Sequence, residues 1–141
     1  MSMETRTGGC ACGAVRFEAE LNGLHYHVCH CTRCRKWGGP AFATAASAIR
    51  TTEGAEAVSI WSSSKHGERA FCGACGTHLW WALKAGGFNA VWIGALDESE
   101  DMTLASQVFT DQRPEHYAFA NKTTDMTGDE VKAAFAGRVK A

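Results

Sequence analysis

An alternation of apolar and polar residues with a period of two is the main pattern of this chain. In residues 14–21, Val15, Phe17, Ala19 and Leu21 are separated by charged residues, which is typical of a half-buried strand. A second strand is predicted over 25–29, after an Asn-Gly turn signal. Further strands are predicted over 40–45, 57–62, 69–72, 77–83 and 90–95. The pattern therefore predicts a mainly β fold.

Helical signals are confined to two short segments. Thr127 and Glu130 fit a capping box, and Val131, Phe135 and Val139 recur at four-residue spacing on one face. A short helical turn is predicted over 32–37. With no internal repeat or linker, we expect a single domain over 1–141, with a core at about 8–120 and a C-terminal extension at 121–141.

Composition and charge narrow the class of protein. The 141 residues are 45% hydrophobic and 21% charged, as in globular proteins. Fourteen Lys and Arg against fifteen Asp and Glu argue against a nucleic-acid partner. No apolar run reaches the roughly 18 residues of a membrane span, and the first residues lack a secretory pattern. We therefore expect a cytoplasmic protein with no membrane partner. The acidic segment 97–101 is predicted to be a solvated loop.

Seven cysteines stand in three groups. They form a Cys-x-Cys pair, a Cys-x-Cys-x-x-Cys group and a Cys-x-x-Cys pair, namely Cys10/Cys12, Cys29/Cys31/Cys34 and Cys72/Cys75. An odd number in a chain without an export signal favours metal binding or thiol chemistry over disulfides.

The spacing of the first and last pairs suits a closed metal site. Residues i and i+2 of a strand face the same side, so Cys10 and Cys12 would present two sulfurs together. Cys72 and Cys75 would converge across a tight turn, in which Gly73 and Gly76 can take positive φ. Two such pairs can close a tetrahedral Cys₄ zinc site.

The remaining Cys29, Cys31 and Cys34 would leave one coordination position open, which is the pattern of a catalytic zinc site. The spacing is also compatible with an iron–sulfur cluster. A fourth ligand from His27 or His78 would close the site. His30 is expected to point to the opposite face of the strand.

Basic and aromatic residues follow the three-cysteine group. Arg33, Arg35 and Lys36 could hold the carboxylates of an anionic substrate or simply form a solvated basic turn. Trp37 is the predicted pocket wall. Weaker candidates for anion binding are Arg69 and His66. His116 and Tyr117 could approach the site, although surface or core placement is the simpler expectation.

The three cysteine motifs together resemble those of the glutathione-dependent formaldehyde-activating enzymes, a family grouped with the centromere-protein-V-like domain. The similar stretches are residues 8–17, 29–36 and 71–76, with weaker similarity at 93–97 and 114–116.

The resemblance implies a single zinc-containing all-β domain of the Mss-four-like type with small helical additions. It also implies two zinc ions per chain: a structural one on Cys10, Cys12, Cys72 and Cys75, and a catalytic one on Cys29, Cys31 and Cys34. The implied activity is that of a carbon–sulfur lyase that joins formaldehyde and glutathione, or a related small thiol. The alternatives are a zinc-stabilised binding module without turnover and a store of zinc or thiols.

Overall fold

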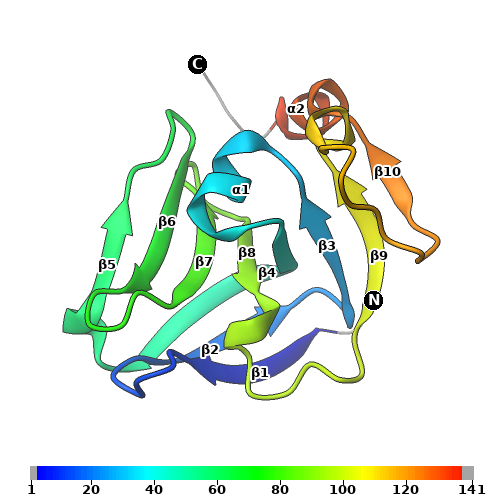
Figure 1. The fold of residues 1–141 in the computed structure, drawn as a ribbon. Helices are drawn as coiled ribbons and strands as arrows, with labels where there is room; N and C mark the ends of the chain where they lie inside the picture. The colour runs from blue at the N-terminus through cyan, green and yellow to red at the C-terminus, as the bar shows by residue number, and fades with distance from the viewer. Residues whose placement is uncertain (1–2, 138–141) are drawn as a thin grey trace.

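The structure is a computed structural model and describes residues 3–137 (Figure 1). Within this range the chain forms ten strands, two α-helices and three 3₁₀ turns. The strands are β1 (Glu4–Gly9), β2 (Arg16–Leu21), β3 (His25–Cys29), β4 (Ala41–Glu53), β5 (Val58–Trp61), β6 (Gly67–Cys72), β7 (His78–Leu83), β8 (Asn89–Trp92), β9 (Thr103–Val108) and β10 (Thr124–Met126). The helices are α1 (Thr32–Gly38) and α2 (Gly128–Phe135), and the 3₁₀ turns are η1 (Ala55–Ala57), η2 (Ile93–Ala95) and η3 (Thr110–Gln112).

The strands form one strongly bent sheet in the order β10-β9-β3-β4-β8-β7-β6-β5, with the β1–β2 hairpin joined to β4 through β2. The 13-residue strand β4 makes this possible. Its first half pairs with β3 and β8, and its second half pairs with β2. In Figure 1, α1 lies between the β5–β7 side and the β3–β9 side of the sheet. The mainly β fold with small helical additions is confirmed.

The predicted alternation of residues 15–21 directs the apolar side chains of β2 and of the residue before it into the core. Val15, Phe17, Ala19 and Leu21 are fully buried, and they pack with other buried side chains, among them Leu79 and Val91. The edge-to-face contact of Phe17 with Trp80, at 5.5 Å between centroids, joins the hairpin to β7. This core fixes the turn after β1 and the turn after β6 in neighbouring positions.

Three strands were missed by the pattern. The sequence of β1 is almost entirely polar, yet the strand forms because all its residues pair with β2, from Glu4↔Leu21 to Gly9↔Arg16. The other two missed strands are β9, which pairs in parallel with β3, and the short β10, which pairs in parallel with β9. Both lie far from β3 in sequence. Two strand ends differ by more than two residues: the strand predicted over 40–45 continues to Glu53, and the one predicted over 90–95 ends at Trp92 and continues as η2.

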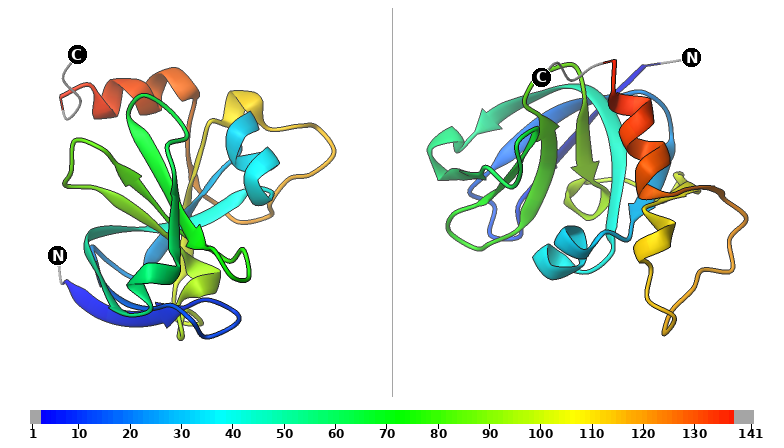
Figure 2. Two further views of the ribbon diagram at one scale, coloured as in Figure 1. Left: turned by 90° about the vertical axis from the view of Figure 1, so that its left-hand side faces the viewer. Right: turned by 90° about the horizontal axis from the view of Figure 1, so that it is seen from above.

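The capping box of α2 is confirmed, with the Thr127 hydroxyl accepting from Glu130 N and the Glu130 carboxylate accepting from Thr127 N. Phe135 packs edge-to-face on Phe88 at 5.1 Å, so α2 reaches the β7–β8 hairpin (Figure 2). Val139, the third residue of the predicted apolar face, lies outside the described residues. In the described part of the chain, neither helix has the length and apolar character needed to cross a membrane.

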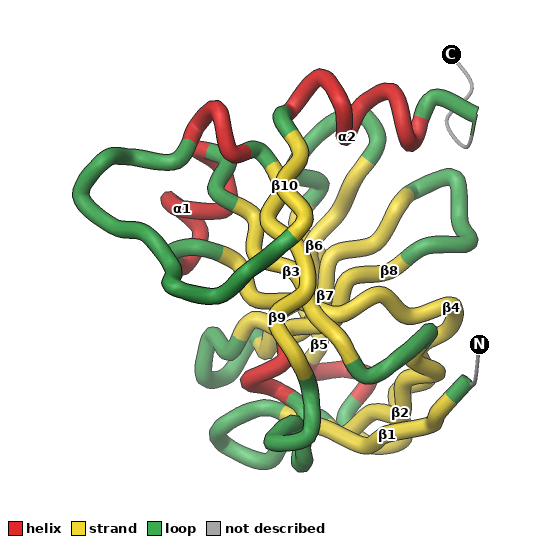
Figure 3. The backbone as a smooth tube through the Cα atoms, turned by 90° about the vertical axis from the view of Figure 1, so that its right-hand side faces the viewer, coloured by secondary structure: helices red, strands yellow, loops and turns green. Residues whose placement is uncertain are grey.

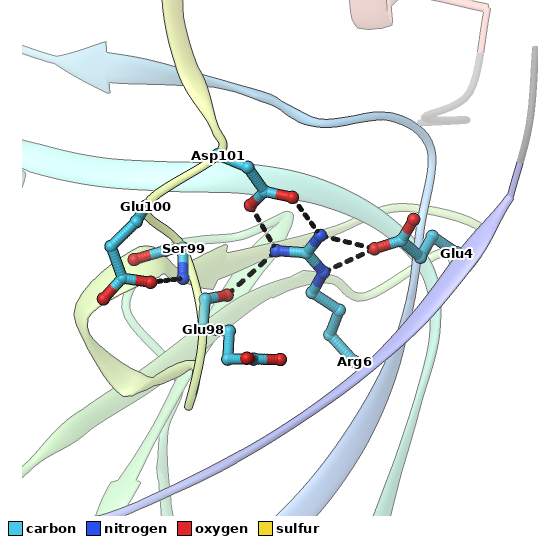
Figure 4. A network of polar contacts seen from close by, with 6 residues as sticks. All are labelled: Glu4, Arg6, Glu98, Ser99, Glu100 and Asp101. Carbon is cyan, nitrogen blue, oxygen red and sulfur yellow. Dashed lines mark hydrogen bonds and ion pairs between the residues drawn. The ribbon is translucent and has the colours of Figure 1, made fainter.

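The acidic segment 97–101 is exposed, as predicted, but it also carries ion pairs to the β1–β2 hairpin. The Arg6 guanidinium donates to both Asp101 carboxylate oxygens at 2.7 and 2.6 Å, to the Glu98 carbonyl at 3.1 Å and to Glu4 (Figure 4). Asp97 accepts from Arg16 and from the Thr7 hydroxyl. These contacts tie the loop before β9 to β1.

Candidate metal and thiol-binding site

Four cysteines from two distant turns come together at one end of the sheet. The sulfurs of Cys10, Cys12, Cys72 and Cys75 all lie within 4.8 Å of one another. Cys10 Sγ is 3.5 Å from Cys12 Sγ, and Cys12 Sγ is 3.8 Å from Cys72 Sγ. Cys10 and Cys72 are buried, whereas Cys12 and Cys75 are exposed. The set has the composition of a closed Cys₄ metal site.

Each pair sits on a turn that ends with a glycine at positive φ. Gly13 has φ 84° and Gly76 has φ 82°, and their amides donate to the carbonyls of Cys10 and Cys72. The prediction for Gly76 is therefore confirmed, and that for Gly73 is wrong. Gly73 has ordinary φ but leaves room for Ser59, whose Oγ would lie 2.7 Å from an added Cβ.

The argument from strand geometry is also corrected. Cys10 and Cys12 lie in the turn after β1, and only Cys29 of the second group lies in a strand. Turns bring the sulfurs together because reversing the backbone lets successive side chains point toward a common centre. A hydrogen bond from Ala11 N to Thr77 Oγ1, at 3.0 Å, joins the two turns directly.

The second group lies where β3 passes into α1. The sulfurs of Cys29, Cys31 and Cys34 lie within 4.8 Å of one another, and this group contains no histidine among the described residues. Cys31 is the N-cap of α1, and its sulfur accepts from Cys34 N at 3.3 Å. Hydrogen bonds from the thiols of Cys29 and Cys34 lower the pKa of Cys31.

The two histidines considered as a fourth ligand have other surroundings. His78 stacks on Trp37 with centroids 4.4 Å apart. His27 is part of β3, and desolvation lowers its pKa to about 4. A metal ion held by these three thiols would have no fourth protein ligand from the described residues and would leave room for an exogenous ligand.

His30 points away from the sulfurs, as expected, into a buried hydrogen-bond network. Its Nδ1 lies 2.7 Å from the Tyr117 hydroxyl and its Nε2 lies 2.8 Å from Gln107 Oε1. Gln107 Oε1 is an acceptor that also receives Arg113 Nη1, so His30 Nε2 donates to it. Desolvation lowers the pKa of His30, and the neutral ring then accepts from Tyr117 through Nδ1.

This network holds the Cys29–Cys31 segment in place. The loop 113–123, which carries Tyr117, passes beside α1 (Figure 3). Tyr117 is half-buried and contacts His30 on the side away from the sulfurs, and His116 is exposed, so neither reaches the cysteine sulfurs. Gln107 was not foreseen. Gln107 lies on β9, a strand that the period-two pattern did not predict, so the sequence offered no signal for its role.

Aromatic side chains from β5, β6 and β7 surround Trp37 of α1. Trp61 stacks on it at 5.2 Å and Phe71 meets it edge-on at 5.4 Å. Arg69 lies over the same ring at 5.9 Å, and its Nη2 donates to Cys34 Sγ at 3.4 Å. Arg69 was a weaker candidate than the basic turn, but its guanidinium contacts a cysteine sulfur.

A shallow pocket of about 400 Å³ opens directly after Cys31. Its lining consists of Thr32, Arg33, Lys36, Trp37 and Trp61. Three of the four predicted substrate-contact residues thus lie together on the pocket wall. The fourth, Arg35, turns the other way, and its Nε donates to the His30 carbonyl at 2.9 Å.

With this geometry in place, comparison with known proteins assigns the family. Residues 5–112 match the profile of the family described as glutathione-dependent formaldehyde-activating enzyme. The chain belongs to that family. The match spans both cysteine groups, the basic turn and β9, and the prediction of the family is confirmed.

Individual relatives agree with this assignment. An uncharacterized lyase of Schizosaccharomyces pombe is 36% identical over 127 residues, which cover 88% of this chain and 92% of the relative. A Halomonas elongata protein, provisionally named glutathione-dependent formaldehyde-activating enzyme, is 37% identical over 83 residues, covering 52% of this chain and 53% of that protein. Membership of an enzyme family of the lyase class, as predicted, is confirmed.

The fold is shared with a solved structure. A crystallographically determined protein of Rhodobacter sphaeroides superposes with a TM-score of 0.59 at 26% identity, covering 70% of this chain and 99% of that one.

Proposed function

We propose that this protein is a zinc-dependent carbon–sulfur lyase-type enzyme that joins formaldehyde to glutathione, or to a related small thiol, forming S-(hydroxymethyl)glutathione. Membership of the family supports the general reaction. The observation that carries the proposal is the three-cysteine group at the head of α1, beside a pocket with basic and aromatic walls.

The donor sets fit two zinc ions per chain. Cys10, Cys12, Cys72 and Cys75 would hold a structural ion, because thiolates prefer zinc among the abundant divalent metals and four of them complete its tetrahedron. Cys29, Cys31 and Cys34 would hold a catalytic ion. The buried Arg69 guanidinium, with Nε and Nη1 unpartnered, fits a centre that bears negative charge.

The pocket residues would bind and orient the thiol substrate. Glutathione carries two carboxylates, and Arg33 and Lys36 present cationic groups at the pocket wall. The Trp37 and Trp61 rings offer an apolar surface for the methylene groups of the tripeptide. The pocket would therefore hold the thiol with its sulfur toward the neighbouring cysteines.

The reaction is an addition in which all atoms are retained. The thiolate sulfur forms a bond to the formaldehyde carbon, the C=O double bond becomes a single bond, and the thiol proton ends on the new hydroxyl oxygen. A free thiol with a pKa near 8.5 is only a few per cent thiolate at pH 7. Zinc, when bound, would lower the pKa of a coordinated thiol. Because formaldehyde is already strongly electrophilic, the chain contributes mainly positioning.

The test is adduct formation from glutathione and formaldehyde, followed by NMR, with wild-type protein and Cys31→Ser. We expect Cys31→Ser to lose the acceleration over the spontaneous reaction and to hold one zinc instead of two, with the circular dichroism spectrum of the wild type. Arg50→Met, on the exposed part of β4, is the control variant, because it changes a residue outside both cysteine groups. Unchanged acceleration in Cys31→Ser would overturn the proposal.

The second candidate function is a zinc-stabilised binding module without turnover. The exposed Trp61 in the pocket is the observation that favours it. Calorimetry separates the two candidates: an enzyme binds glutathione in a way that Cys29→Ser abolishes, whereas a module with two structural metals does not respond to glutathione at all.

A further inference from the structure

Arg69 is a buried cation in the middle of β6. Its register neighbours are Trp61 on β5 and Trp81 on β7, and the residue is only 5% exposed. Nη2 donates to Cys34 Sγ at 3.4 Å, and the guanidinium carbon lies 5.9 Å from the centroid of the Trp37 ring. Nε and Nη1 are buried without any hydrogen-bond partner.

Such an arrangement is unfavourable unless negative charge lies close by. A guanidinium stays charged, and burying its unpaired N–H groups costs more free energy than burying those of a neutral group. The ion pairs found among residues 3–137 involve Arg6, Arg16 and Arg50, but not Arg69. Among residues 3–137, the acceptor that Arg69 contacts is the sulfur of Cys34, which would carry negative charge as a metal-bound thiolate.

Charge counting distinguishes the two cysteine groups. A divalent ion with four thiolates bears a net charge of −2, and at the first group water reaches the exposed Cys12 and Cys75 to solvate it. A divalent ion with three thiolates bears −1. At the second group this charge lies beside the buried Arg69, so that the centre and Arg69 together are neutral.

We infer that Arg69 is the counter-charge that lets the three-cysteine centre accept an anionic fourth ligand, namely the thiolate of a small thiol. This inference rests on the proposed metal centre at Cys29, Cys31 and Cys34. Without Arg69, a fourth thiolate would bring the centre to −2 in a partly buried place. With Arg69 the total is −1.

Arg69 is thus a specificity-determining residue that acts through Cys34. It favours an anionic ligand over a neutral one, because a neutral ligand leaves the charge of the centre unchanged. Arg33 and Lys36 have a different part: they line the open pocket and would contact the distant carboxylates of the ligand.

The experiment uses full-length protein with Co²⁺ in place of zinc, whose visible spectrum reports ligand exchange. Glutathione and the neutral ligand imidazole are titrated against wild type, Arg69→Met, Arg69→Lys and Arg50→Met. Arg50→Met removes one arginine charge from an exposed site on β4 and is the matched control. Release of metal to a chelator is measured in parallel.

We expect Arg69→Met to weaken glutathione binding at least about tenfold, the lower end of effects of residues that support metal ligands. Imidazole binding should change less than about threefold, so the preference for the anion is lost. Arg69→Lys should retain most of the preference, and Arg50→Met all of it. Arg69→Met should release one of its two metal equivalents to the chelator faster than the wild-type protein does.

Two results would overturn the inference: wild-type ligand preference in Arg69→Met, or equal losses for glutathione and imidazole, which indicate a structural role alone. If Arg69→Met does not fold, the comparison of Arg69→Lys with Arg69→Gln decides the same question. A failure of the proposed function looks different, because wild-type protein would then bind a single metal or show no spectral response to glutathione.

Discussion

The hydroxyl of Tyr117 lies 2.7 Å from Nδ1 of His30, the residue between Cys29 and Cys31. Because His30 is fully buried, this contact links the long loop after η3 to the strand that carries the first thiol of the three-cysteine group. The loop therefore helps to fix the position of that group without contributing a ligand.

Replacing Tyr117 by phenylalanine should leave His30 Nδ1 without its donor. A buried unsatisfied acceptor costs about 1–3 kcal/mol, and we expect a loss of this size in the free energy of unfolding, measured with urea at fixed zinc concentration. Tyr26→Phe is the control, since the Tyr26 ring packs on Phe42 and its hydroxyl has no hydrogen bond within the described residues. Equal stability of Tyr117→Phe and wild type would contradict the role of the contact.

Gly76→Ala should destabilise the protein by about 1–2 kcal/mol, because φ of 82° is unfavourable for an L-residue with a side chain. The expected cause is conformational alone, since an added Cβ at Gly76 meets nothing within 4 Å. Gly94→Ala is a close control: it also adds a Cβ in open space, but at ordinary φ. Thermal unfolding of the two variants, with zinc content measured in each, distinguishes the effects. Similar melting temperatures would show that the turn tolerates alanine.

Arg33→Gln and Lys36→Gln should each raise KM for glutathione several-fold while changing kcat little, because both residues line the pocket away from the reacting sulfur. Increasing salt should reduce the difference in KM between each variant and wild type, since exposed charges are screened. Lys84→Gln, on the β7–β8 turn, is the control. A fall in kcat with unchanged KM would place these residues at the reaction centre instead.

Acid should weaken the junction between β1 and the loop before β9. Arg16 and the Thr7 hydroxyl lower the pKa of Asp97, and Arg6 lowers that of Asp101, both from 3.8. Their folded pKa values lie below the unfolded ones, so this contribution to stability is present above pH 3.8 and is lost as the pH falls through the folded values. The double variant Asp97→Asn, Asp101→Asn should show a flatter dependence of stability on pH in this range. A slope as steep as that of wild type would contradict the assignment.

The successes of sequence reasoning were local. The alternation in β2, the capping box at Thr127 and the three cysteine motifs depend on residues a few positions apart, and the structure contains each feature. The family could also be recognised from these motifs, since Cys-x-Cys and Cys-x-x-Cys spacings are conspicuous in a short chain.

The errors arose where pairing over long distances decided the outcome. The polar strand β1 exists because β2 pairs with it, and β9 because it lies parallel to β3, far away in the chain. Cys10 and Cys12 were predicted to lie on a strand, but they lie in the turn after β1, which brings their sulfurs to 3.5 Å from each other. No period-two pattern carries such information.

The sequence by itself determined the candidate ligands: which thiols exist, how they are spaced, and the basic turn that follows Cys34. Only the tertiary structure decided their surroundings, because burial and charge compensation depend on strands that are distant in sequence. It placed Arg69 of β6 against Cys34 of α1 and left two of its nitrogens unpartnered. It also turned Arg35 toward the His30 carbonyl while Arg33 and Lys36 face the pocket. The identity of each candidate cysteine ligand follows from the sequence, whereas the charge around its sulfur depends on the fold.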